Sequence, residues 1–264
     1  MALHELPLDP GYLHGRFSRD LEPVLAVDPG DSVRISVPNS GWRRSRDDAV
    51  TSRDPELDTG HALAGPIEVR GARAGQTLAV RIDEIEPGPW GATFTQPPHR
   101  MDWELDAGVG RTAGRTIRLA PFLGVLGMPP DKPGVHSTIP PRRCGGNIDC
   151  KELVAGTTLY LPIPVDGALF SAGDGHAAQG DGEVSGTAIE TPVDATLTLD
   201  SPTTFRSTGR SRGRTMPGSR LASTSISASR PESPSTGCSI SWCASTASPG
   251  RTRSASHRCS SISG

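Results

Sequence analysis

The apolar residues of this chain fall into short alternating or clustered runs that are separated by glycine and proline. Six such runs occupy residues 32–37, 67–70, 78–85, 116–119, 157–162 and 195–199. Alternation with a period of two and an abundance of β-branched residues are typical of strands, whereas stretches with the 3.6-residue period of a helix are scarce. The pattern therefore predicts a mainly β body with short strands, many turns and a sandwich-like or barrel-like architecture.

The composition changes near residue 200. The first 199 residues are long enough for one domain with a hydrophobic core and carry an excess of acidic residues. Residues 201–264 are rich in Ser and Arg, contain no Lys or Val, and have one acid, Glu232, and one leucine, Leu221. So few large apolar side chains do not offset the entropy of ordering a chain. We therefore divide the chain into a body at residues 1–199 and a disordered tail at residues 200–264.

A change of reading frame in a GC-rich gene explains the tail composition. Serine codons of the TCG type, read one base earlier, become codons for Leu, Val, Phe or Asp. When codons that the genetic code allows are chosen for the tail and read one base earlier throughout, they encode amphipathic, helix-forming strings. These strings correspond to residues 223–227, 238–253 and the last few residues. We place the change near residues 199–201. An Arg-rich segment could instead bind nucleic acid, but these arginines are scattered among few aromatics, so we expect no nucleic-acid partner.

The segment 173–183, GDGHAAQGDGE, concentrates one imidazole and three carboxylates among small residues. Its glycines permit positive φ and close backbone approach, while His176, Asp181 and Glu183 supply a titratable nitrogen and hard oxygen ligands. We expect a Gly-rich site loop with strands on both sides. The G-x-G-x-x-A spacing at residues 173–178 also fits a dinucleotide-binding turn, but no helix follows that could hold a pyrophosphate.

The stretch 169–190, LFSAGDGHAAQGDGEVSGTAIE, resembles the signature of the acetamidase/formamidase family. The resemblance extends through CGGNID at 144–149, GTTLYLP at 156–162, TGHALAGP at 59–66, residues 124–130 and 21–31, and His14-Gly15. These motifs occur in family order and cover about residues 10–199. Members of this family hydrolyse short aliphatic amides such as formamide or acetamide. The resemblance implies that activity, a small amide substrate, a divalent metal ion, homo-oligomers of an intact chain, and an α+β fold whose C-terminal helical part is lost here.

Amide hydrolysis needs a polarised carbonyl, an activated water and a proton for the leaving nitrogen. Our candidate catalytic residues are Glu183 as general base, His176 as ligand or acid, and Asp149, which follows two glycines and Asn147. Our candidate metal ligands are Asp149, His176, Asp181 and His61. Zinc or calcium would fit, and such a cation would act as a Lewis acid and lower the pKa of its water.

Several other residues have two interpretations. His14 could reach the site from another loop, or be a hydrogen-bonded turn residue, and Asp174 is a ligand or a turn former between two glycines. Cys150, beside Lys151, could be a nucleophile, although an isolated thiol is more often inert. Cys144 and Cys150 have no second pair at zinc spacing, so we expect both to remain thiols.

Two functional hypotheses remain for the body. One is a metal-assisted amidase of short aliphatic amides, and the other is a non-catalytic, β-rich domain with a structural cation site; an open coordination position beside a base would distinguish them. In addition, loss of the C-terminal part could leave the chain inactive. The N-terminus MALHELPLDP lacks an apolar leader and no run approaches about 20 apolar residues, so we expect a cytoplasmic protein without a membrane partner.

Overall fold

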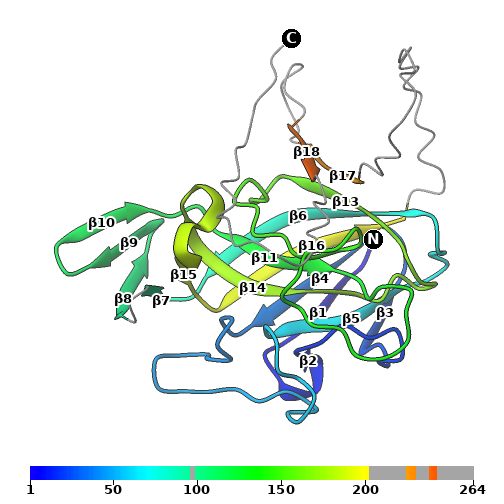
Figure 1. The fold of residues 1–264 in the computed structure, drawn as a ribbon, viewed down its shortest axis with the longest axis horizontal. Helices are drawn as coiled ribbons and strands as arrows, with labels where there is room; N and C mark the ends of the chain where they lie inside the picture. Colours follow the sequence, from blue (N-terminus) through cyan, green and yellow to red (C-terminus); the bar gives the residue numbers. More distant parts are fainter. Residues whose placement is uncertain (96–98, 202–223, 230–237, 243–264) are drawn as a thin grey trace, which may run out of the picture.

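The structure is a computed structural model that describes residues 1–95, 99–201, 224–229 and 238–242. These residues form two β-sheets, and their helical elements are the short 3-10 turns η1 (Pro10–Tyr12) and η2 (Asp181–Gly186). The ribbon in Figure 1 shows the long strands β6, β14 and β16 running through the middle of the molecule. The prediction of a mainly β fold is confirmed.

The first sheet has seven strands, in the order β1-β4-β16-β6-β13-β17-β18. β1 is parallel to β4 and the other pairs are antiparallel. The strands are β1 (Leu3–Leu6), β4 (Asp31–Val37), β6 (Thr77–Pro87), β13 (Thr158–Pro162), β16 (Val193–Asp200), β17 (Thr224–Ser229) and β18 (Cys238–Trp242).

The second sheet has eleven strands. Eight follow the order β10-β9-β8-β7-β15-β14-β11-β12, and β5 pairs with β14 and also with β2 and β3. The strands are β2 (Leu13–His14), β3 (Leu25–Val27), β5 (Leu63–Val69), β7 (Trp90–Thr95), β8 (His99–Asp106), β9 (Val109–Thr112), β10 (Arg115–Arg118), β11 (Phe122–Gly127), β12 (Gly145–Asn147), β14 (Phe170–Gln179) and β15 (Ala188–Glu190).

One hydrophobic core lies between the two sheets. β4 alternates strictly between buried and partly buried residues, and β16 does so over its first half. Their inward side chains join one apolar cluster with residues of β5, β11 and β14 from the other sheet. β14 contacts β4, β6 and β16 across this core. The arrangement is sandwich-like, and the six predicted runs lie in or overlap β4, β5, β6, β10, β13 and β16.

The site segment differs from the loop that we expected. Residues 170–179 form the continuous strand β14, and residues 170–178 are all buried. Small side chains permit this position between close neighbours: a Cβ on Gly175 would lie 2.4 Å from Val193 Cγ1 and 2.6 Å from the Thr191 carbonyl oxygen. The glycines therefore bring the imidazole and carboxylate of this strand into the protein interior instead of exposing them in a turn.

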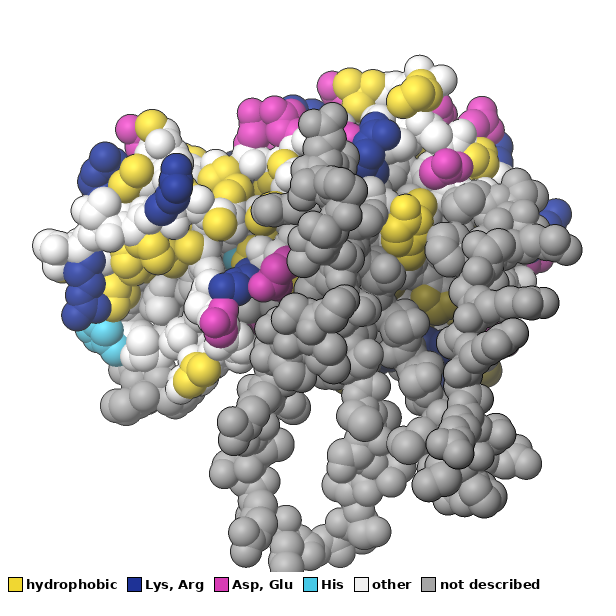
Figure 2. Space-filling view, turned by 90° about the horizontal axis from the view of Figure 1, so that it is seen from above, with side chains coloured by type: hydrophobic (Ala, Val, Ile, Leu, Met, Phe, Trp, Pro, Cys, Tyr) yellow, Lys and Arg dark blue, Asp and Glu magenta, His cyan; other side chains and the backbone are white. Residues whose placement is uncertain are grey.

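Strands β8, β9 and β10 form an extension of the second sheet that projects from the body (Figure 1). All four residues of β10 are exposed, so this predicted strand is not half-buried. Figure 2 shows basic and apolar side chains side by side over this end of the molecule.

The strands β17 and β18 lie within the segment 200–264, which composition predicts to be disordered, and β17 pairs with β13. The rest of that segment lies outside the described residues, and the domain division at residue 199 stays a prediction. Within the described residues, no helix has the length and apolar character that crossing a bilayer requires.

Candidate active site

His176 is the centre of the candidate site. Its side chain extends from β14 and is almost completely buried. The Nε2 atom lies 3.0 Å from Glu190 Oε1 and 3.6 Å from Asp174 Oδ1. The Phe122 ring on β11 meets the imidazole edge-on, with ring centroids 4.9 Å apart. Strand pairing places Phe122 and Glu190 on either side of His176, so the sheet itself fixes the ring.

Four carboxylates from different parts of the chain surround this imidazole. Asp174 precedes it on β14, Glu190 ends β15, Asp149 follows β12 and Glu183 lies in η2. One set of potential metal ligands is Asp149, Asp174 and His176, and a second is His176, Glu183 and Glu190; within each set the ligand atoms lie within 4.8 Å of one another. The structure thus brings together Asp149, His176 and Glu183, the three predicted catalytic residues.

Gly124 of β11 provides the space for two of these carboxylates. A Cβ on this residue would lie 2.5 Å from Asp174 Oδ2 and 2.7 Å from Asp149 Oδ1. Both distances are shorter than any normal contact, so a larger residue would displace at least one carboxylate. The site therefore depends on a glycine that carries no chemistry of its own.

Three acids of the site have left-handed backbone conformations. The φ angles are 47° at Asp149, 61° at Asp174 and 45° at Glu183. Positive φ is uncommon outside glycine, although Asp tolerates it better than most residues. Such conformations are typically concentrated at functional sites, because the surrounding structure must impose them.

Burial and like charge change the proton affinities of the cluster. Burial and the nearby Glu190 raise the pKa of Asp174 to about 7, and burial and Asp174 raise the pKa of Asp149 to about 6. Burial opposes protonation of His176, but its hydrogen bond to Glu190 and the charge of Asp174 raise its pKa to about 10. Burial and Asp149 raise the pKa of Glu183. The crowded carboxylates therefore favour a positive charge among them.

Several buried polar atoms near the site have no hydrogen-bond partner within the described residues. They are Asp174 Oδ1, His176 Nδ1, Asn147 Oδ1 and Gln179 Oε1. Leaving such atoms unpaired costs about 1–3 kcal/mol each. Oxygen and nitrogen atoms that can act as metal ligands, and that lie unpaired next to converging carboxylates, fit a bound divalent cation.

The other two predicted ligands lie in different surroundings. His61, just before β5, is half-buried, and its Nδ1 lies 2.9 Å from Thr138 Oγ1. Burial lowers the pKa of His61, while the charges of the nearby Asp149 and Glu190 oppose that change. Asp181 instead forms an ion pair with Lys151, and its side chain is 90% exposed. Neither His61 nor Asp181 belongs to either set of potential ligands among the described residues.

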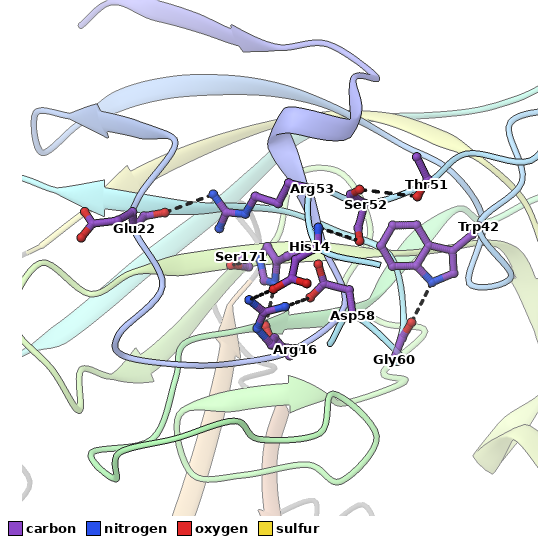
Figure 3. A network of polar contacts seen from close by, with 11 residues as sticks. His14, Arg16, Glu22, Trp42, Thr51, Ser52, Arg53, Asp58, Gly60 and Ser171 are labelled. Carbon is purple, nitrogen blue, oxygen red and sulfur yellow. Dashed lines mark hydrogen bonds and ion pairs between the residues drawn. The ribbon is translucent and has the colours of Figure 1, made fainter. Parts of the chain in front are cut away.

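His14 lies in a separate buried network (Figure 3). Its Nδ1 donates to the Arg16 carbonyl oxygen at 2.6 Å, and its Nε2 accepts from Ser171 Oγ at 2.9 Å. Both ring nitrogens are therefore occupied, so His14 is not a ligand in this arrangement. Cys144 and Cys150 are thiols, as expected, and donate to the Met128 carbonyl oxygen and to Glu152, respectively.

Sequence reasoning missed Glu190 and left the role of Asp174 open. Glu190 ends a short apolar strand, and its proximity to His176 arises only from the pairing of β14 with β15. An acid at the end of an Ala-Ile pair was the signal that could have identified it. Asp174 belongs to the cluster because β14 is buried. The glycines on either side of Asp174 suggested a turn instead of a buried strand.

The sequence profile of the Acetamidase/Formamidase family matches residues 5–103 and 132–202. The chain belongs to this family. Among curated relatives, it is 26% identical to the acetamidase of Mycolicibacterium smegmatis over 65% of this chain and 61% of that protein. It is also 26% identical to the formamidase of Methylophilus methylotrophus over 66% of this chain and 60% of that protein. This family member thus spans about 60% of the length of these relatives.

Solved structures confirm the acetamidase/formamidase fold. The acetamidase from Bacillus halodurans is 27% identical, with a TM-score of 0.65 over 74% of this chain and 70% of that chain. A recombinant predicted acetamidase/formamidase from Thermoanaerobacter tengcongensis has a TM-score of 0.68 over 87% of this chain and 74% of that chain. At 24% identity, the second comparison supports the fold alone.

Proposed function

We propose that this chain carries the active site of a cation-assisted hydrolase of short aliphatic amides, with formamide or acetamide as substrate. The observation that supports this proposal most directly is the convergence of four carboxylates on one buried imidazole beside unpaired donor atoms. Family membership supports the same reaction class. In that reaction, water oxygen bonds to the carbonyl carbon, the C–N bond breaks, and the nitrogen leaves as ammonia.

The donor set fits a zinc-type cation better than calcium. Asp174, Asp149 and His176 would hold the ion, with His61, just before β5, as a further nitrogen donor. Calcium takes oxygen ligands only, whereas imidazole nitrogen with carboxylate oxygen is typical of zinc. When bound, such an ion supplies Lewis acidity and lowers the pKa of a coordinated water.

Glu183 is the proposed general base. It lies in η2 at the less buried side of the cluster, and burial and Asp149 raise its pKa towards the range in which a carboxylate exchanges protons efficiently. It takes a proton from the attacking water and returns it to the leaving nitrogen. Glu190 and Phe122 hold the His176 ring in place, and Asp149 would bind the ion together with Asp174 and His176.

One observation favours a second candidate function. Asp174 is 3% exposed and His176 is 1% exposed, and such burial is also typical of a closed, structural cation site. The alternative is therefore a non-catalytic β-rich domain that binds a cation.

The family match ends at residue 202, next to the inferred change of reading frame at 199–201. This position supports the proposal that the residues after it no longer follow the family sequence.

The test is ammonia release from formamide and acetamide, with and without chelator, by this chain and by a form whose reading frame is restored after Leu199. We expect activity that chelator removes and that Glu183→Gln lowers at least 100-fold. Activity in the restored form only would identify this chain as an inactive product. Stoichiometric zinc binding without activity in either form would support the cation-binding domain instead.

A further inference from the structure

Gln179 connects strand β14 to the segment after β12 that carries Asp149. It is the last residue of β14, three positions after His176, and its Nε2 donates to the Asp149 carbonyl oxygen at 3.0 Å. A carbonyl oxygen only accepts, so this contact fixes which end of the side-chain amide is the nitrogen. The other end, Oε1, is buried and has no hydrogen-bond partner within the described residues.

The residue held by this contact has an unfavourable backbone conformation. Asp149 has a φ of 47°, and its N–H donates to the Gly124 carbonyl oxygen at 3.2 Å. Gln179 holds the next carbonyl oxygen, so the peptide groups on both sides of the Asp149 Cα are fixed. Fixing both groups determines the direction of the Cα–Cβ bond and therefore where the carboxylate lies.

That direction places Asp149 in the space above Gly124, next to Asp174. A left-handed Asp without this restraint would relax towards extended backbone and withdraw its carboxylate, since such conformations persist only where neighbouring structure imposes them. The position of Gln179 leaves its Oε1 buried without a partner, which is unfavourable. The contact with Asp149 therefore explains this position better than full hydrogen bonding of the Gln179 side chain does.

We infer that Gln179 is a positioning residue that holds Asp149 in its site conformation. The inference rests on the proposed function in that Asp149 is treated as a cation ligand, but the backbone restraint is independent of any activity. Residues that orient metal ligands typically change metal affinity 10–100-fold when they are replaced. Gln179 acts entirely through Asp149, so its effect should vanish when the Asp149 carboxylate is absent.

The experiment compares zinc affinity, by calorimetry with Zn²⁺ alone, in wild type, Gln179→Met, Asp149→Asn and the double variant. Met has a similar length and cannot donate. We expect Gln179→Met to weaken zinc binding 10–100-fold, and the double variant to bind as weakly as Asp149→Asn alone. Binding by Gln179→Met within twofold of wild type, or an equal further loss in the double variant, would overturn the inference.

A second readout separates this inference from the proposed function. Hydrogen exchange of the Asp149 amide, followed by NMR in the metal-free protein, should be at least tenfold faster in Gln179→Met. An unchanged rate would refute the positioning role even if zinc did not bind at all. The matched control is Gln76→Met, because Gln76 also bonds to a backbone group, the Arg73 N–H at 2.8 Å, but in an exposed turn. It should leave both readouts unchanged.

Discussion

Two buried polar clusters involve the same strand, β14, and differ in how charge is arranged. Around Arg16, opposite charges alternate: its guanidinium donates to Asp58 Oδ1 at 2.7 Å and to Asp54 Oδ2 at 2.9 Å, and neutral His14 bonds to Ser171 of β14. Around His176, carboxylates converge on one imidazole. Alternating charges offset one another, although Asp58 Oδ2 and two nitrogens of the neighbouring Arg53 have no hydrogen-bond partner within the described residues. Converging like charges instead raise the free energy of the folded protein unless a cation joins them. The first arrangement serves the fold, and the second fits a binding site.

Breaking the Arg16 cluster should have the largest effect on stability. Arg16→Leu would leave the Asp58 side chain, which is 0% exposed, as a buried carboxylate without its cation. We expect the free energy of unfolding to fall by about 3–5 kcal/mol, measured by urea denaturation. Arg70→Leu breaks an exposed pair with Asp28 and should cost less than about 1 kcal/mol. Similar effects of the two variants would show that the Arg16 cluster stabilises the fold no more than an exposed ion pair does.

Neutralising a carboxylate in the His176 cluster should have the opposite effect on stability. Asp174→Asn keeps the shape and tolerates positive φ, but removes one buried like charge. In the presence of chelator we expect a higher free energy of unfolding than wild type, together with zinc affinity at least tenfold weaker. Asp181→Asn, an exposed acid paired with Lys151, is the control and should change neither. A destabilised, zinc-competent Asp174→Asn would contradict our assignment of this cluster as a binding site.

The smallest expected effect comes from titration of His14 in the Arg16 cluster, measured as the pH dependence of the free energy of unfolding. Burial, and then the charge of Arg53, lower the pKa of His14 to about 3, so the folded protein binds fewer protons here than the unfolded chain, whose histidine pKa is about 6.5. Stability from this residue is therefore complete above about pH 6.5 and declines as pH falls towards 3. We expect a loss of at most about 1.4 kcal/mol between pH 6.5 and 5.5. His14→Gln should reduce that slope; an identical slope would show that His14 is protonated without penalty.

Sequence reasoning predicted the alternating strands well, because β4 and β16 place one face in the core. It mistook residues 173–179 for a loop, because a strand of Gly and Ala buried on both faces shows no alternation. It grouped Asp149, His176, Asp181 and Glu183 by the chemistry that amide hydrolysis needs, the reaction that the family resemblance implies. It could not separate Asp181 from Glu183, since the turn η2 that directs them differently is a property of the backbone. It also missed Glu190, which strand pairing alone brings to His176.

The position of β16 constrains how this protein can form during synthesis. β16 is the last strand of the body in sequence, yet it lies between β4 and β6 in the middle of the first sheet. β4 and β6 are made more than a hundred residues earlier, and each pairs with β16 and not with the other, so they cannot join one sheet until residues 193–200 leave the ribosome. Nascent chains that stop before residue 193 should therefore remain protease-sensitive and bind chaperones, whereas those extending beyond residue 200 can close the sheet.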